Sequence, residues 1–358
     1  MACPGRFDQP CPIPQSCPYH LIFETSPPPG SDALRTHEEI PRPFVIAPIT
    51  NGGWMEQGRH LIEPGSELSF NLTLIGRAQE FFPYFVVALR EIDRLGRRPN
   101  RLAPTGEGRV RDIEAGITLQ GSGTKASSLS FKSPRQVELR RIHLLDPLSA
   151  ASWPVYDAKE NLVHPIRKQL TLADCASIPP PSSDRLTIEF LTQTRLKHQG
   201  AWARVPEFHI LFRRLLGRLS SLSRFHCGAP LDVDFKALIA RAADVRLVDN
   251  QTRWVSWTRY SNRQRQRMDW DGIIGSATYD FAAPASAPVI PNQGPSIRPE
   301  GEASTQSDLA ENAEHDPARI HAQAAPLFWK FLKFGEFVHV GHGATFGLGK
   351  CAIGNLEG

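Results

Sequence analysis

The residues of this chain whose types and spacing best suit chemistry lie in one glycine-rich run near the C-terminus. The run is HVGHGATFGLGK, from His339 to Lys350, and it places four glycines within nine residues: Gly341, Gly343, Gly347 and Gly349. Glycine permits a positive φ and a close backbone approach, and successive N–H groups can form a concavity that binds an anion. The run therefore suits either a phosphate-binding loop with basic and imidazole side chains or a tight turn before a last strand.

The spacing of the glycines excludes the two common nucleotide-binding loops. A Walker loop needs G-x-x-x-x-G-K-[ST], whereas Lys350 is followed by Cys351, which has no hydroxyl for Mg²⁺. A dinucleotide-binding fingerprint needs G-x-G-x-x-G between a strand and a helix, and here the third glycine comes one residue late. Only eleven residues follow Gly347, too few for a βαβ unit. These departures argue against an enzyme that holds a nucleotide in this loop.

Basic residues form local clusters, although the net charge of the chain is only +4. Because the whole molecule is not a polycation, any nucleic-acid surface must come from such clusters. Three of them are Arg94, Arg97, Arg98 and Arg101; Arg213, Arg214 and Arg218; and Arg259, Arg263, Arg265 and Arg267, the last with Trp254, Trp257 and Tyr260 nearby. Basic residues with aromatic residues between them suit a phosphate backbone and stacked bases. One cluster alone could equally be a solvated arginine face.

The length of 358 residues predicts two domains, at about 100–200 residues per domain. In the first half, alternating apolar residues predict strands at 43–49, 67–76 and 116–123. In the second of these strands, Leu68, Phe70, Leu72 and Leu74 are expected to face inward. A helix is predicted over 78–96, with an apolar face made of Phe85, Ala88, Leu89 and Ile92. The segment SIPPPSSD at 177–184 is typical of a domain boundary.

The second half repeats the order of strand, helix and strands. A strand is predicted at 185–194 and a helix over 206–228, with Leu211, Leu215, Leu219 and Leu222 on one face. Two strands around a basic connection are expected before residue 282. Residues 283–325 lack aromatic residues and are rich in Ala, Pro, Ser and Glu, which predicts a disordered insertion. A short helix leading into a strand is then expected just before the glycine run.

Metal binding and membrane insertion find little support in the sequence. Cys3, Cys11 and Cys17 cluster near the N-terminus, and His20 could complete a set of four zinc ligands. Their C-x₇-C-x₅-C spacing is wider than the C-x₂₋₄-C of structural zinc sites, so we favour reduced cysteines and expect no metal and no cofactor. No apolar run approaches ~20 residues, and the N-terminus lacks the regions of a signal peptide. We therefore expect a cytoplasmic protein with no membrane contact.

Several segments, in this order, resemble a known family: the CRISPR-associated endoribonucleases that process precursor CRISPR RNA, members of the RAMP superfamily. The matching segments are PFVIAPI, LIEPGSELSFNLTLIGRAQEFFPYFVVAL, LTIEFLTQTRLK, PEFHILFRRLLGRLSSL, RYSNRQRQRMDWDGIIGSATYDF and HVGHGATFGLGK. The segment CPIPQSCPYHLIFET is also similar to a cysteine-containing stretch that precedes the family's second strand. The resemblance covers most of residues 17–358, apart from the insertion.

The resemblance implies an α+β fold of two tandem ferredoxin-like (RRM-like) domains with antiparallel sheets. We expect an irregular Cys/Pro-rich segment at 1–42, a first domain at 43–184, and a second domain at 185–358 that contains the insertion and the glycine-rich loop. The family normally opens with a strand and a helix, and that helix often supplies the catalytic histidine. This chain begins just past that point, so the first domain is expected to be incomplete at its N-terminus, through a misassigned start or a shortened form.

The chemistry that the resemblance implies is metal-independent cleavage, in which a general base activates a ribose 2′-OH to attack the adjacent phosphate. With the usual helix absent, His342 is the first candidate for the base and His20 is the second. His209 lies next to an apolar helix face and is expected to be structural. The expected RNA contacts are the loop glycines Gly341, Gly343, Gly347 and Gly349, together with Lys350, Arg259, Arg263, Arg213 and Arg214.

Two functions from different classes remain open at this point. The chain is either an endoribonuclease for precursor CRISPR RNA or a catalytically inactive subunit that holds the repeat-derived end of the guide RNA. In both cases the expected partner is the RNA repeat, with a CRISPR effector complex as a second partner. A homodimer is also compatible with the sequence.

Overall fold

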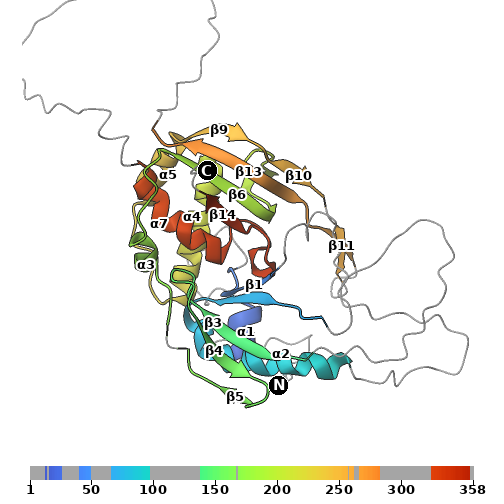
Figure 1. Ribbon diagram of the computed structural model, residues 1–358. Helices are drawn as coiled ribbons and strands as arrows, with labels where there is room; N and C mark the ends of the chain where they lie inside the picture. Colours follow the sequence, from blue (N-terminus) through green and yellow to red (C-terminus); the bar gives the residue numbers. More distant parts are fainter. Residues whose placement is uncertain are drawn as a thin grey trace, which may run out of the picture.

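The structure of the chain is a computed structural model. It describes residues 13, 16–25, 40–49, 66–96, 138–166, 168–256, 258–261, 266–282 and 324–354. The strand expected at 116–123, most of the expected insertion at 283–325, and Cys3, Cys11 and Arg263 lie outside these ranges. Within them, the protein is an α+β structure whose sheets are all antiparallel. Figure 1 shows its elements in two groups, one from each half of the chain.

The C-terminal half is built on one sheet of five strands. These are β6 (Arg185–Thr194), β9 (Arg246–Asn250), β10 (Arg253–Val255), β13 (Gly272–Asp280) and β14 (Cys351–Gly354). The order is β10-β13-β6-β14, and β9 also pairs with β13. The strand expected at 185–194 is confirmed as β6, in which Leu186, Ile188 and Phe190 alternate on the buried side. This sheet places the end of β6 beside the start of β14, which is where the glycine run ends.

Helices cover the apolar face of this sheet and form the main core (Figure 1). They are α4 (Phe208–His226), α5 (Phe235–Ala243) and α7 (Ala324–Val338), with the short α3 (Leu172–Ala176) beside α7. The four leucines expected on one face of α4 are all buried, so that prediction is confirmed. Phe208 and Phe212 of α4 contact Phe328 of α7, with ring centroids 5.1 Å and 4.7 Å apart. Each such buried ring contributes about 1.5–3 kcal/mol, so this contact fixes α7 and the loop that follows it.

The N-terminal half holds two smaller sheets. One pairs β1 (Phe44–Pro48) with β2 (Phe70–Leu74), and the other joins β3 (Arg141–Leu145), β4 (Ser152–Asp157) and β5 (Leu162–Val163). The helices are α1 (Pro18–Phe23) and α2 (Phe82–Gly96), with a 3₁₀ turn, η2 (Gly76–Phe81), before α2. Ile22, Phe44 and Phe85 form a small core between α1, β1 and α2.

The buried face of α2 differs from the expected one. Phe85 is buried as predicted, but Ala88 is exposed, and Val86 is buried instead. The reason is that α2 packs against two groups of residues, Phe44 on one side and Val155 of β4 on the other, so that its buried face is wider. The inward position predicted for Leu68 is also wrong, because β2 begins only at Phe70 and Leu68 is exposed.

The chain between α7 and the glycine run also differs from expectation. We expected a strand there, but α7 continues to Val338 and the next residue, His339, has a φ of 61°, in the left-handed region. A strand needs extended backbone, so this conformation ends regular structure and turns the chain into the loop. A short 3₁₀ turn, η3 (Ala344–Phe346), follows inside the loop.

Two small hairpins extend from the C-terminal half. One consists of β7 (Lys197–His198) and β8 (Ala201–Trp202), and it directly follows β6. The other consists of β11 (Thr258–Ser261) and β12 (Gln266–Asp269), and it lies between β10 and β13 in the chain. The first hairpin brings Trp202 to the glycine run.

Candidate nucleic-acid interface

The glycine run forms a compact loop whose conformation needs glycine. Gly341, Gly343, Gly347 and Gly349 all have φ between 68° and 85°. A Cβ on Gly349 would lie 1.7 Å from the carbonyl oxygen of Val340, and a Cβ on Gly347 would lie 2.8 Å from that of Ile46 in β1. Any larger residue at these two positions would collide with backbone. These glycines therefore let the loop close on itself and pack against the N-terminal half.

Several N–H groups of the loop donate hydrogen bonds within the protein. His342 donates to the carbonyl of Arg195 at 3.1 Å, and Gly349 donates to that of Gln193 at 3.1 Å. Phe346 donates to Gly343 at 2.9 Å. Lys350 donates its N–H to the hydroxyl of Thr192, 2.9 Å away. The loop is thus held to the end of β6, and this hydrogen bonding makes it a rigid support for the side chains it exposes.

His339 supports the base of the loop. Its side chain is buried, and Nδ1 lies 3.1 Å from the carbonyl oxygen of Leu348 at the other end of the loop. Burial lowers its pKa to about 4, with smaller contributions from Lys350 and Arg218, and these outweigh its hydrogen bond to Leu348. The ring is therefore neutral near pH 7 and closed off from solvent, which makes it a structural residue rather than a general base.

His342 is one of two exposed side chains in the loop. Its ring lies 5.8 Å from that of Trp202 in the β7–β8 hairpin. The guanidinium of Arg195 lies over the Trp202 ring, 4.2 Å from its centre, and pairs with Asp271 at 3.3 Å. An exposed imidazole, a half-buried indole and an ion-paired guanidinium thus lie next to one another.

Phe346 is the other exposed side chain of the loop, with 44% of its surface accessible. Its ring lies 5.7 Å from that of Trp270, which follows β12, with the two planes 34° apart. The guanidinium of Arg42, just before β1, lies 5.9 Å from the centre of the Phe346 ring. Three segments distant in sequence therefore place flat side chains together on this side of the loop.

The arginines predicted on α4 have different environments. Arg213 is exposed, as a phosphate contact would need. Arg214 is half-buried and donates from Nε to the carbonyl of Lys197, which ties α4 to the β7–β8 hairpin. Arg218 is deeper still, and donates to the carbonyl of Val338 at 2.9 Å, with its pKa lowered to about 10 by burial. Along α4, the arginines thus change from surface charges to supports of the loop.

A pair of histidines lies beside these arginines. The rings of His198 in β7 and His209 in α4 are 5.6 Å apart and meet edge to face. Burial lowers the pKa of His209, and the neighbouring His198 lowers it further. His209 was expected to be structural, and its half-buried position in the α4 packing agrees with that expectation.

Two other candidate residues lie on separate elements. Arg259 is in β11, opposite Met268 of β12, so the backbone places it on a hairpin at the edge of the molecule (Figure 1). His20 is half-buried on α1, which packs on the small core of the N-terminal half. The two candidate bases thus belong to different surroundings, His20 to α1 and His342 to the glycine loop.

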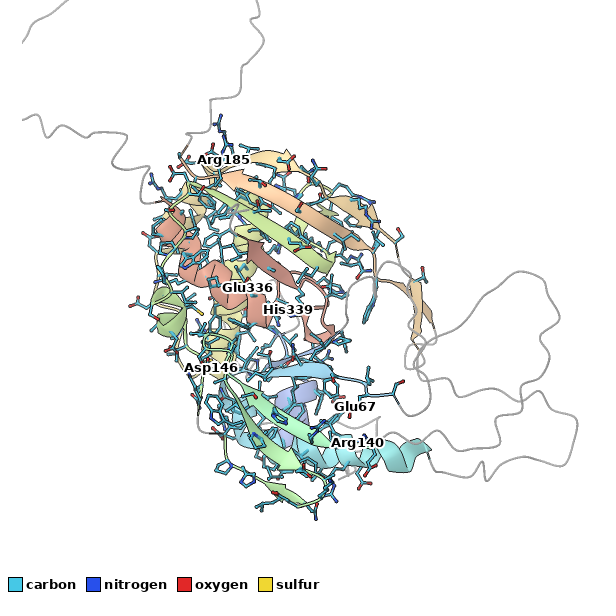
Figure 2. The ribbon with its side chains drawn as sticks, viewed as in Figure 1. Glu67, Arg140, Asp146, Arg185, Glu336 and His339 are labelled. Atoms are coloured by element: carbon cyan, nitrogen blue, oxygen red, sulfur yellow. The ribbon has the colours of Figure 1, made fainter. Side chains whose placement is uncertain are left out.

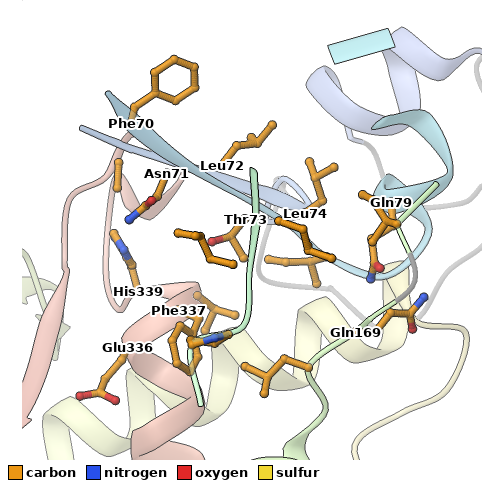
Figure 3. A pocket seen from close by; sticks show the side chains of 18 of the residues that line it. Phe70, Asn71, Leu72, Thr73, Leu74, Gln79, Gln169, Glu336, Phe337 and His339 are labelled. Atoms are coloured by element: carbon orange, nitrogen blue, oxygen red, sulfur yellow. The ribbon is translucent and has the colours of Figure 1, made fainter. Parts of the chain in front are cut away.

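A large cavity lies between the two halves (Figure 3). Its volume is about 2770 Å³, and its lining includes Leu72 and Leu74 of β2 and Phe337 of α7. Several of its cations are already paired: Arg140 with Glu67 at 3.4 Å, Arg141 with Glu67 at 3.7 Å, and Lys333 with Glu336 at 2.5 Å (Figure 2). The lining also includes His339 and Lys350 of the glycine run, so the cavity adjoins the loop.

Over the described residues, no three His, Cys, Asp or Glu side chains lie close enough together to hold a metal ion. None of the helices in these ranges is both long and apolar enough to cross a bilayer. Cys17, the one member of the N-terminal cysteine group within these ranges, is a free thiol.

Sequence reasoning missed four residues of this surface: Arg42, Arg195, Trp202 and Trp270. Arg195 and Trp270 lie in family-like segments, but the pairing of β6 with β13 and the packing of β1 on the loop are what bring the four together. The signal that could have identified two of them is an arginine directly after β6 and a tryptophan directly after β12.

Comparison with known proteins identifies the C-terminal half. Residues 188–351 match the family model described as CRISPR-associated endoribonuclease Cas6, and residues 1–168 match a second model, described as an N-terminal domain. Residues 188–351, which hold most of β6, all of α4 and the glycine loop, therefore match the Cas6 family. This match confirms the resemblance found in the sequence. No curated protein matches the chain.

Solved structures of Cas6 proteins are similar to parts of the chain. The product complex of Cas6 (TTHB231) from Thermus thermophilus is 15% identical, with a TM-score of 0.43, and the match covers 88% of this chain and 84% of that one. The product complex of Cas6 (TTHA0078) is 16% identical, with a TM-score of 0.33, over 52% of this chain and 57% of that one. A partial Cas6-RT-Cas1–Cas2 complex is 13% identical, with a TM-score of 0.29. That match covers 55% of this chain and 29% of that one. The chain thus spans a little over half of the first Cas6 (TTHA0078) structures, and no residue role is transferred from any of these.

Proposed function

We propose that this protein binds the repeats of precursor CRISPR RNA and cleaves them without a metal ion. The observation that carries the proposal is the Cas6-family domain, whose rigid glycine loop exposes an imidazole next to an indole and a fixed guanidinium. Such a surface offers the three groups that RNA cleavage by an internal nucleophile requires: a proton acceptor, a cation and a flat face for a base. The same proposal places the protein in the cytoplasm, together with its RNA.

The fold that we propose consists of two ferredoxin-like domains, 43–184 and 185–358, preceded by the segment 1–42. In support, the C-terminal half runs strand, helix, strands, helix, strand from β6 to β14, in the sheet order β10-β13-β6-β14. The two strands next to one another in the middle, β6 and β13, are the first and third of that series, as in a ferredoxin-like sheet.

The RNA would lie along the exposed face of the loop. Lys350 is half-buried at the end of the loop, and Arg213 is exposed on α4 next to the β7–β8 hairpin. Arg214 fixes that hairpin, so its contribution to binding is indirect. Arg259 and Arg263 are further phosphate contacts that the sequence predicts. Phosphate contacts of this kind position the RNA, while unpaired bases stack on aromatic side chains.

Cleavage would use the 2′-OH of the RNA as its own nucleophile. His342 would take the proton from the 2′-OH, and the oxygen would attack the adjacent phosphorus. The bond from phosphorus to the 5′ oxygen would break, and that oxygen would take up a proton from water. The products are a 2′,3′-cyclic phosphate and a fragment with a 5′-OH. Lys350 would stabilise the charge that develops on the phosphate oxygens, while Arg195, which is paired with Asp271, would hold Trp202 beside His342.

A second candidate function is that of an inactive RNA holder. The observation that favours it is that His339, the other imidazole of the run, is buried and neutral. The loop then offers one imidazole, whereas attack by a 2′-OH uses both a base and an acid. His20 on α1 is the second candidate for the base, and because the two histidines lie on different elements, mutation can separate their roles.

An RNA cleavage assay in EDTA tests the proposal. A labelled repeat RNA is incubated with the wild-type chain, His342→Ala and His20→Ala, and a second RNA carries a 2′-deoxy residue at the cleavage position. Cleavage that is lost in His342→Ala and with the 2′-deoxy RNA would support the loop as the catalytic site. Loss only in His20→Ala would assign the base to α1. Tight binding without cleavage would support the holder, and the absence of binding would refute the RNA function.

A further inference from the structure

One aromatic side chain of the loop is exposed although nearby residues of the loop are buried. Phe346 is 44% exposed, whereas Thr345 and Leu348 are 8% and 1% exposed. Because this side chain contributes little to the core, the fold of the loop does not require an apolar residue at position 346. One exposed apolar residue is ordinary on a protein surface, so the inference must rest on what surrounds it.

Two further flat side chains from distant segments surround Phe346. Trp270 lies 5.7 Å from it with a plane tilted by 34°, and the guanidinium of Arg42 lies 5.9 Å from its ring centre. Arg42 is held in place because its Nε donates to the carbonyl of Phe23 at 2.8 Å. The positions of Phe346, Trp270 and Arg42 are therefore set by three separate parts of the fold, and not by the loop alone.

The same arrangement occurs at the other exposed side chain of the loop. His342 lies beside Trp202, and Arg195 lies over Trp202 at 4.2 Å. The two groups are joined, because Arg195 pairs with Asp271, the residue next to Trp270. This ion pair offsets the charge of the carboxylate next to Trp270. Each exposed side chain of the loop thus has one aromatic neighbour and one nearby cation.

We propose that Phe346 and Trp270 form a stacking site for one unpaired nucleobase of the RNA, with Arg42 at its edge; this rests on the proposed function. An aromatic pair with a cation at its edge matches a base and its phosphate, since every base has a π-face and every nucleotide carries one negative charge. The site accounts for the exposure of Phe346 and for the fixed position of Arg42. Phe346 and His342 are the two exposed side chains of the loop, so the RNA would contact both as it passes over the loop.

Replacing an aromatic residue that stacks on a base by alanine weakens the binding of single-stranded RNA by about 5- to 150-fold per base. We expect a loss in this range for Phe346→Leu, and a change of less than about threefold for Phe346→Tyr, which keeps the ring. Phe235→Leu is the matched control, since Phe235 is also exposed but lies on α5. The salt dependence of binding should not change in Phe346→Leu, because no charge is removed.

The experiment measures the affinity of a labelled repeat RNA by fluorescence anisotropy, first with intact RNA and then with single abasic substitutions along it. The proposal predicts one position at which the abasic RNA binds wild type and Phe346→Leu equally well, since the base that Phe346 contacts is already missing. Equal affinity of wild type and Phe346→Leu for intact RNA would overturn it. An equal loss at every abasic position would also overturn it, because no single base would then depend on Phe346.

Indole fluorescence of the folded protein provides a test that needs no change at Phe346. RNA stacked at this site should quench Trp270, and Trp270→Phe should remove that part of the quenching while keeping an aromatic ring. Quenching that is identical in wild type and Trp270→Phe would refute the stacking site. If the wild-type chain binds no RNA at all, the proposed function itself is refuted, and this outcome is distinct from tight binding that ignores Phe346.

Discussion

Acidification should destabilise the folded chain through His339, at the base of the glycine loop. Burial lowers the pKa of this histidine to about 4, against 6.5 for an ordinary histidine. The folded state therefore keeps the neutral ring, whereas the unfolded chain takes up a proton below about pH 6.5. The neutral His339 ring therefore leaves the free energy of unfolding at its full value above pH 6.5. That free energy falls as the pH drops toward 4, because the unfolded state then binds more protons than the folded state.

The magnitude follows from the two pKa values. Each pH unit between 6.5 and about 4 corresponds to about 1.4 kcal/mol, so complete protonation removes about 3 kcal/mol from the free energy of unfolding. At about pH 5 the loss already amounts to about 2 kcal/mol. Because folded domains are stable by only about 5–15 kcal/mol, such a loss is a large fraction of the total.

Urea unfolding at about pH 7 and about pH 5 measures this loss, with His339→Asn as the control. Asparagine tolerates a left-handed backbone and carries an amide N–H₂ that can donate to the carbonyl of Leu348, but it does not titrate. Burial also lowers the pKa of His226, and that residue is present in both proteins. The difference between the two pH dependences therefore isolates His339.

We expect the wild-type chain to lose about 2 kcal/mol more than His339→Asn between the two pH values. Equal losses in the two proteins would refute the reasoning, since they would mean that His339 has the same pKa in the folded and unfolded states. A greater loss in the variant would refute it as well, because it would assign the acid sensitivity to other groups.

Three further predictions concern the loop and its supports. Gly349→Ala should cost about 3 kcal/mol or more, because its Cβ would lie 1.7 Å from a carbonyl oxygen, whereas Gly354→Ala, with nothing within 4 Å, should leave the melting temperature unchanged. Arg213→Ala should weaken RNA binding and reduce its salt slope by about one without loss of stability, whereas Arg214→Ala should lower the melting temperature; the reverse pattern would contradict these environments. Tyr279→Phe should lower the free energy of unfolding in urea by about 1–3 kcal/mol, because its buried hydroxyl donates to a carbonyl at 2.6 Å; an unchanged value would mean that water reaches that carbonyl.

Regular elements with a clear apolar period could be predicted from the sequence alone. β6 and α4 are confirmed because their buried residues recur at the period that the strand and the helix impose, and the leucines of α4 needed no knowledge of what covers them. The face of α2 was predicted less well. Its buried residues depend on contacts with both β1 and β4, and that arrangement is not encoded in the helix itself.

The side chains of the candidate site could be predicted only in part. His342 and the loop glycines were found because they lie in one motif of local sequence. Trp270 and Arg42 are separated from Phe346 by about 76 and 304 residues and meet it only through sheet pairing and the packing of β1 on the loop. Local patterns carry no information on such contacts. Nor could the sequence show that His339 is buried while His342 is exposed.

The close approach of Gly347 to β1 makes the loop a direct contact between the two halves of the chain. With no Cβ at this position, the backbone of the C-terminal half rests directly on the carbonyl of Ile46 in the N-terminal half. A side chain introduced there would collide with β1 and so disturb the contact between the halves. Because this contact is made by backbone on both sides, a displacement of β1 would be passed directly to the loop.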